Sequence, residues 1–102
     1  MTIQVNAPFT VGEGLQTLID EKVGKLTTYF DKIESVTIFF RDHDNRSQST
    51  PTGNSAEIRL NVPGQILYAE ETSESFEKSL IAAAEKMRKQ LIRYKDQLST
   101  HN

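Results

Sequence analysis

The feature that most constrains the fold of this chain is a long run of helical periodicity close to its end. From Ser73 to about Leu98, apolar side chains return every three or four residues and so share one face of a helix. They are Phe76, Leu80, Ala83, Ala84, Met87, Leu91, Tyr94 and Leu98. A helix of this length is a rod of about 39 Å. Its single apolar stripe has to be covered by the rest of the chain.

Four shorter segments show the alternation of polar and apolar side chains that is typical of strands. They are residues 2–6, 34–41, 56–62 and 65–70. Pro63 and Gly64 fit the two central positions of a type II turn, so the last two segments are predicted to form a hairpin. The segment 42–55 is rich in Asn, Ser, Thr, Pro and Gly, and it is predicted to be a loop longer than most connections.

A second amphipathic helix is predicted between the first two strands. Apolar residues from Val11 to Phe30 recur at three- and four-residue steps, and Thr10 with Glu13 has the spacing of a capping box at the helix start. The order is therefore β-α-β-β-β-α. One apolar stripe on each helix predicts an α+β fold in which both helices cover the same face of a four-stranded sheet. A chain of 102 residues is expected to form a single domain, residues 1–102.

Composition and hydropathy exclude several classes of protein. The chain has no cysteine, which excludes a disulfide framework and any thiolate metal site. No segment approaches the roughly 18 apolar residues of a membrane span. The first six residues lack the basic start and apolar run of a secretory signal. We therefore expect a cytoplasmic protein that has no membrane partner.

Side chains suited to catalysis or metal binding are few. His43 lies between Asp42 and Asp44, but neighbours in sequence rarely complete a coordination sphere alone, and a solvated turn explains the pattern equally well. No nucleophile can be paired with a base from the sequence. We expect no enzyme, no cofactor, no metal and no small-molecule substrate. A hydrolase with its site in segment 42–55 is the catalytic alternative.

Charge is distributed unevenly along the chain. The formal net charge of −2 by itself argues against a nucleic-acid binder. However, residues 1–77 carry six basic and twelve acidic side chains, whereas residues 78–95 carry six basic side chains and only Glu85 as an acid. Such asymmetry is typical of a surface that contacts a polyanion.

The basic residues of the last helix are predicted to form a stripe away from its apolar face. At about 100° per residue, one sector holds Lys78, Lys86, Lys89 and Arg93, and the opposite flank holds Arg88 and Lys95. Neighbours along such a row are about 5–6 Å apart. Cations at this spacing can contact successive phosphates of RNA and displace counterions.

Three further residues are candidates for the same surface. Gln90 lies between the basic row and the core, where its amide can reach a phosphate, a sugar or a base edge. Lys22 and Lys25 extend the patch if the two helices lie side by side. A basic row opposite an apolar face is also what an ordinary solvated helix carries, so the charge pattern leaves both interpretations open.

Several segments resemble one known family. The β-α-β-β-β-α order, the run KVGKLTTYF at 22–30, the run AEE at 69–71 and the run EKMRKQLIRYK at 85–95 are similar to the ribosome hibernation promoting factors. These proteins are also called ribosome-associated inhibitors or sigma-54 modulation proteins. The last run matches the family's lysine-apolar-x-basic-Gln-Leu-x-basic signature. The resemblance covers nearly the whole chain, although segment 42–55 is longer than the family leads us to expect.

The resemblance implies a protein that binds the small ribosomal subunit in the channel of mRNA and tRNA and silences ribosomes in stationary phase or stress. It implies rRNA contacts by Lys86, Lys89, Gln90 and Arg93. The chain ends soon after the last helix, without the long forms' ribosome-pairing domain or the inhibitor-type acidic tail. We therefore expect a short promoting factor, and whether it pairs ribosomes stays open. The alternative is a protein-interaction module that modulates a transcription factor, as the older family name suggests.

Overall fold

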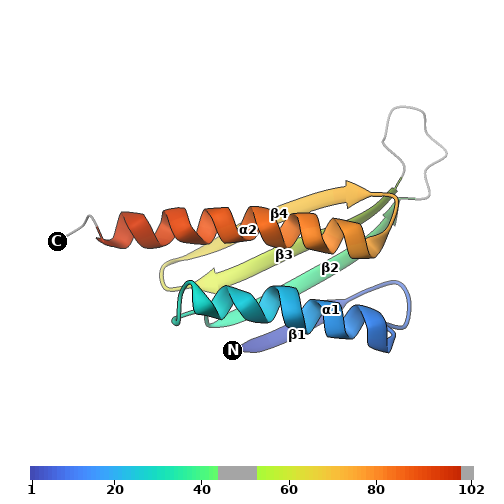
Figure 1. The fold of residues 1–102 in the computed structure, drawn as a ribbon, viewed down its shortest axis with the longest axis horizontal. Helices are drawn as coiled ribbons and strands as arrows, with labels where there is room; N and C mark the ends of the chain where they lie inside the picture. Colours follow the sequence, from blue (N-terminus) through green and yellow to red (C-terminus); the bar gives the residue numbers. More distant parts are fainter. Residues whose placement is uncertain (44–52, 100–102) are drawn as a thin grey trace.

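A computed structural model of the chain describes residues 1–43 and 53–99. Its elements are β1 (Thr2–Asn6), α1 (Glu13–Gly24), a 3-10 turn η1 (Lys25–Thr28), β2 (Ser35–His43), β3 (Gly53–Val62), β4 (Gln65–Ser73) and α2 (Phe76–Ser99). The strands form one sheet in the order β1-β2-β3-β4 (Figure 1). The predicted order of elements is therefore confirmed.

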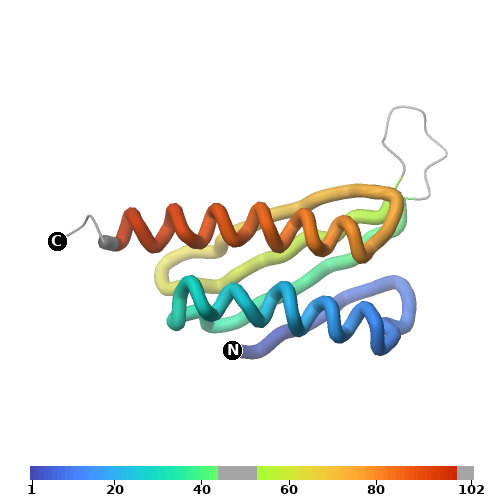
Figure 2. The backbone as a smooth tube through the Cα atoms, viewed as in Figure 1, coloured from blue at the N-terminus to red at the C-terminus, as the bar shows by residue number. Residues whose placement is uncertain are grey.

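The sheet is mixed, and both helices lie on one of its faces. β1 runs parallel to β2, because α1 carries the chain back across the sheet, whereas β2, β3 and β4 are successively antiparallel. Figure 1 shows α1 and α2 side by side in front of the strands, and the tube in Figure 2 shows the same two layers. The α+β prediction, with both helices on one face, is confirmed.

The core fills the space between the helices and the sheet. Its fully covered side chains come from every layer and include Ile19, Val23, Val36, Ile38, Ile58, Leu60, Leu80, Met87 and Leu91. Each such large apolar side chain contributes about 1.5–3 kcal/mol when it is removed from water. At one end of the core, Phe30 meets Tyr94 edge to face at 5.4 Å between ring centroids. The Tyr94 hydroxyl donates to the carbonyl of Pro63 at 2.8 Å, which ties α2 to the β3–β4 turn.

The turn and the start of α2 follow from local chemistry. Gly64 has a φ of +86°, as the third residue of a type II turn requires. Ser75 caps α2, because its Oγ accepts a hydrogen bond from the backbone N–H of Lys78 at 3.1 Å. The buried hydroxyl of Ser79 donates to the carbonyl of Asn54 at 2.5 Å and fastens the first turn of α2 to β3.

Three predictions about local structure are wrong. The capping box does not form, since α1 starts after Gly12, which makes no side-chain cap, and Thr10 lies before that turn. The strands extend into the predicted loop 42–55, with β2 ending at His43 and β3 beginning at Gly53; residues 44–52 lie outside the described residues. Leu98 is 48 % exposed, because α2 extends past the end of the sheet (Figure 1).

Replacing Leu91 by alanine is expected to lower the free energy of unfolding by about 2–5 kcal/mol, because this side chain is fully buried. Leu98→Ala is a matched control on the same helix, and a change within about 0.5 kcal/mol is expected for it. Urea unfolding followed by circular dichroism measures both. Equal losses in the two variants would contradict the position of α2 on the sheet.

Candidate nucleic-acid interface

The two flanks of α2 face different neighbours. The helix packs over β3 and β4, so one flank borders the outer edge of β4 and the other borders α1 (Figure 1). Lys86 and Gln90 lie on the β4 side, where both contact that strand. Arg88 lies on the α1 side, where its guanidinium carbon is 5.9 Å from the ring centroid of Tyr29. The basic residues of α2 therefore differ in their neighbours: some lie beside β4 and others beside α1.

Lys86 and Gln90 cover the outer edge of β4. The Lys86 ammonium is 2.6 Å from the Glu71 carboxylate and donates to the carbonyl of Glu70 at 3.3 Å. The Gln90 amide nitrogen donates to the carbonyl of Tyr68 at 2.6 Å. Alternate carbonyls of an edge strand point away from its neighbour and need other partners. Two of the predicted RNA-binding side chains are thus already engaged within the chain, although half of the Lys86 side chain remains exposed.

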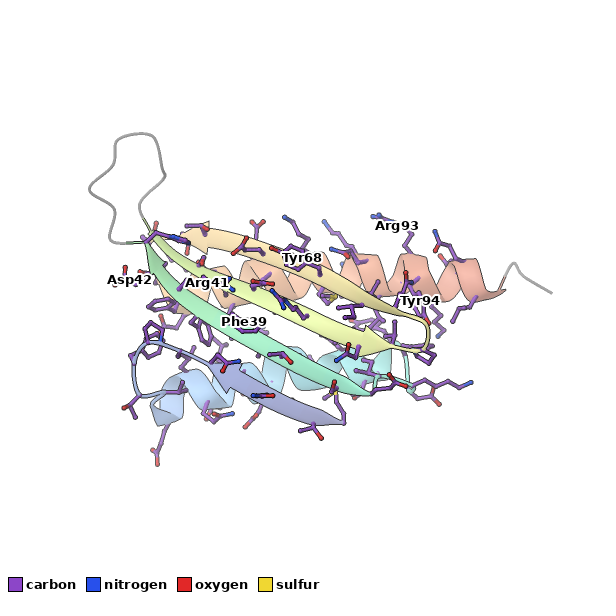
Figure 3. The ribbon with its side chains drawn as sticks, turned by 180° about the vertical axis from the view of Figure 1, so that it is seen from behind. Phe39, Arg41, Asp42, Tyr68, Arg93 and Tyr94 are labelled. Carbon is purple, nitrogen blue, oxygen red and sulfur yellow. The ribbon has the colours of Figure 1, made fainter. Side chains whose placement is uncertain are left out.

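Lys89 and Arg93 form the unpaired part of the predicted stripe. Both are exposed, and neither makes an ion pair or a side-chain hydrogen bond with any residue that the structure describes. Figure 3 shows the Arg93 side chain extending away from the sheet into open space. Lys78 is different, because its ammonium pairs with Glu74 one turn earlier. A phosphate that binds Lys89 or Arg93 has no internal ion pair to displace.

Lys22 and Lys25 line a groove between the helices. The groove has a volume of about 350 Å³, an apolar floor that includes Leu26 and Ala84, and Arg88 on its far wall. Arg88 is held by Glu85, with its Nε 3.0 Å from a carboxylate oxygen. The helices do lie side by side, which was the condition for Lys22 and Lys25 to extend the patch. The lysines of the first helix nevertheless face Arg88, which the helical projection placed on the opposite flank, rather than Lys86.

A cluster of ions that no sequence pattern indicates lies on the uncovered face of the sheet. The Glu57 carboxylate is 2 % exposed and receives Arg41 Nη1 and Arg59 Nε, each at 2.5 Å. Burial alone raises the pKa of Glu57, but the hydrogen bonds and charges of the two arginines outweigh it and lower the pKa. The alternation of β3 placed Glu57 among polar positions. Only the pairing of strands shows that two cations converge on it.

The metal and hydrolase interpretations concern residues around the β2–β3 connection. His43 Nε2 lies 3.1 Å from the hydroxyl of Ser55, and Ser55 is fully buried, so a substrate cannot reach it. Asp44 lies outside the described residues. Within 1–43 and 53–99, no three side chains of His, Cys, Asp or Glu gather as a metal site would need. Among those same residues, no helix has the length and apolar character needed to cross a membrane.

Comparison with known proteins gives a consistent result. Residues 3–99 match the family described as sigma 54 modulation protein / S30EA ribosomal protein. The ribosome hibernation promotion factor of Deinococcus radiodurans is 32 % identical over 87 residues, which are 83 % of this chain and 44 % of that protein. The ribosome hibernation promoting factor of Escherichia coli K12 is 28 % identical over 93 residues, 89 % of this chain and 88 % of that one. The chain thus spans less than half of the first relative and most of the second.

Solved structures share the fold. A ribosomal subunit interface protein from Coxiella burnetii superposes with a TM-score of 0.78 at 22 % identity, over 94 % of this chain and 99 % of that one. The N-terminal domain of Thermus thermophilus Protein Y gives a TM-score of 0.71 at 15 % identity, over 91 % and 94 % of the two chains. At these identities the likeness supports the architecture. The names of the family and of its members denote regulators and ribosome-associated proteins, which agrees with the expectation of no catalysis.

The lowered pKa of Glu57 predicts that stability depends on pH. Its ionised form stabilises the fold above the unfolded pKa of about 4.3, and this contribution is lost as the pH falls through the lower folded pKa. Glu57→Gln is therefore expected to be less stable than wild type at pH 7, with the difference shrinking below about pH 4. Urea unfolding across this pH range measures it, with the exposed Glu77→Gln as control. A difference that is constant with pH would contradict the assignment.

Proposed function

The chain belongs to the sigma 54 modulation protein / S30EA ribosomal protein family, and from this premise we propose that it is a hibernation factor that docks on the small ribosomal subunit. The relatives named above are ribosome hibernation factors. The subunit presents rRNA, a dense polyanion, and this is the partner that a basic surface on an acidic chain would select. The action is expected in the cytoplasm, where ribosomes are.

The observation that carries the proposal is the unpaired charge on the helical face. Lys89 and Arg93 on α2 are exposed cations, and among the described residues neither makes a direct ion pair, although the charge of Glu85 acts on Lys89. The half-buried Lys22 and the exposed Lys25 on the α1 side add two more cations at the interhelical groove. Most acidic side chains lie in residues 1–77, so contacts with RNA phosphates are expected mainly along α2. Lys86 and Gln90, at the border of α2 with β4, can also contact RNA through those N–H groups of their side chains that do not bind β4.

Steric exclusion is the mechanism that this geometry supports. Two helices packed on one sheet make a rigid body that is 18 Å across its shortest axis, and α2 is a rod of about 36 Å. Held by its helical face in the channel for mRNA and tRNA, such a body occludes both ligands without any chemical step. Occlusion of the channel does not by itself pair two ribosomes, and ribosome pairing is not part of the proposal.

The family description also favours a second function. Its words "sigma 54 modulation" name a transcription factor as the target, which would make the chain a protein-interaction module. The two functions differ in their response to salt. Binding through phosphates weakens steeply as salt rises, whereas an apolar protein interface is much less sensitive.

Binding to purified small subunits, measured between 50 and 200 mM salt, tests the proposal. Four to six phosphate contacts give a log–log slope of magnitude about 3 to 5. Lys89→Glu/Arg93→Glu removes two contacts, so the slope is expected to fall by about 2 and binding to weaken at every salt concentration. Lys78→Glu on the same helix is the matched control, with a smaller loss because Glu74 already neutralises Lys78.

The outcome that rejects the proposal is equally definite. If the folded double variant sediments with the subunit as well as wild type and keeps its salt slope, the helical face is not the docking surface. A wild-type chain that does not sediment with the subunit, yet binds the sigma factor, would assign the second function instead.

A further inference from the structure

The sheet face opposite the helices carries aromatic and arginine side chains. If the protein docks through its helices, these side chains do not contact that partner surface. Phe39 and Arg41 on β2 and Tyr68 on β4 lie on this face (Figure 3). Arg59 on β3 shares it as the strand partner of Tyr68, and we call these four residues the open-face cluster. Strand pairing places Arg59 directly opposite Tyr68, and Phe39 directly opposite Glu57. The cluster therefore spans three adjacent strands near the middle of the sheet.

The guanidinium groups of both arginines lie over one aromatic ring. The guanidinium carbons of Arg41 and Arg59 lie 5.1 and 4.7 Å from the ring centroid of Phe39. The buried carboxylate of Glu57 fixes both guanidinium groups, while 42 % and 46 % of the two side chains remain exposed. A partner that stacks on these planes meets side chains that are already ordered, so it loses less entropy on binding.

The cluster also offers a ring and free donors. Tyr68 is 49 % exposed, and its hydroxyl donates to the Glu70 carboxylate at 3.2 Å. Burial and the nearby carboxylates of Glu57 and Glu70 raise the pKa of Tyr68, so its ring is uncharged at neutral pH. Arg59 uses only its Nε toward the described residues, which leaves its two terminal nitrogens as donors.

These properties fit a nucleobase better than an apolar protein surface. Unpaired bases stack on aromatic rings and guanidinium planes, and their edges accept hydrogen bonds from arginine. A protein interface instead has a buried core that is mainly apolar. Here the centre of the face is an ion cluster, and Ile66 and Tyr68 are the large exposed apolar side chains that β4 adds to it.

We propose that the open-face cluster binds unpaired nucleotides of an RNA strand by stacking. This inference rests on the proposed function, because a thin body docked by its helices in a channel walled by RNA turns its sheet face toward further RNA. The cationic charges of Arg41 and Arg59 are balanced by Glu57 and Glu70. Binding at this face therefore depends on stacking and little on salt, unlike binding at the helical face.

Titration of the ¹⁵N-labelled full chain with a ten-nucleotide oligouridylate, followed by NMR chemical shifts, tests the proposal. Shifts are expected at Phe39, Arg59 and Tyr68. Affinity is expected to fall by about threefold or less between 50 and 200 mM salt, as for a single phosphate contact. Tyr68→Ala is expected to weaken binding at least about fivefold, whereas Tyr68→Phe keeps the ring and should bind like wild type. A duplex RNA of the same length should leave these resonances unshifted.

The helical variant Lys89→Glu/Arg93→Glu separates the two proposals. It is expected to lose subunit binding but to bind the oligonucleotide at the sheet face as wild type does. If oligouridylate shifts only the helical face, or if folded Tyr68→Ala binds it as tightly as wild type, the stacking proposal is wrong and a protein becomes the partner class for this face. Failure of the hibernation proposal would be seen in the subunit-binding experiment, in which the wild-type chain would not bind small subunits.

Discussion

The burial of the apolar stripe of α2 against β3 and β4 is the constraint on which the rest of the structure depends. Leu80, Met87 and Leu91 have no exposed surface, so the helix cannot rotate about its axis without uncovering them. Once that rotation is fixed, each charge on the helix has a fixed direction. Lys86 points to the edge of β4, and Arg88 points to α1. The electrostatic pattern of the helical face is therefore a consequence of core packing.

The elements that sequence predicts well are those whose signals are local. The β3–β4 hairpin follows from alternating side chains and one turn, and the extent of α2 follows from its periodicity. The cap of α1 could not be predicted, because the spacing of Thr10 and Glu13 does not determine which peptide begins the helix. Leu98 was misplaced because periodicity shows where a stripe runs, and it does not show where the sheet beneath it ends.

The exposure of the candidate side chains could be predicted from the sequence, whereas their contacts with other elements could not. Lys89 and Arg93 are recognisable as polar positions of an amphipathic helix, and their exposure agrees with that. The contacts of Gln90 with Tyr68 depend on which strand lies beside α2, 22 positions away in sequence. The convergence of Arg41 on Glu57 depends on the register of β2 and β3. Contacts of this kind arise from tertiary pairing and leave no periodic mark in the sequence.

The covering of the β4 edge by side chains of α2 also affects the tendency of the protein to self-associate. An open strand edge is a template on which a second molecule can add a strand and begin an aggregate. On one side of the sheet, Lys86 and Gln90 occupy carbonyls that such a strand would use. On the other side, the edge strand β1 is only five residues long, and short edges offer few rungs to an incoming chain. The fold thus limits edge-to-edge growth of its sheet.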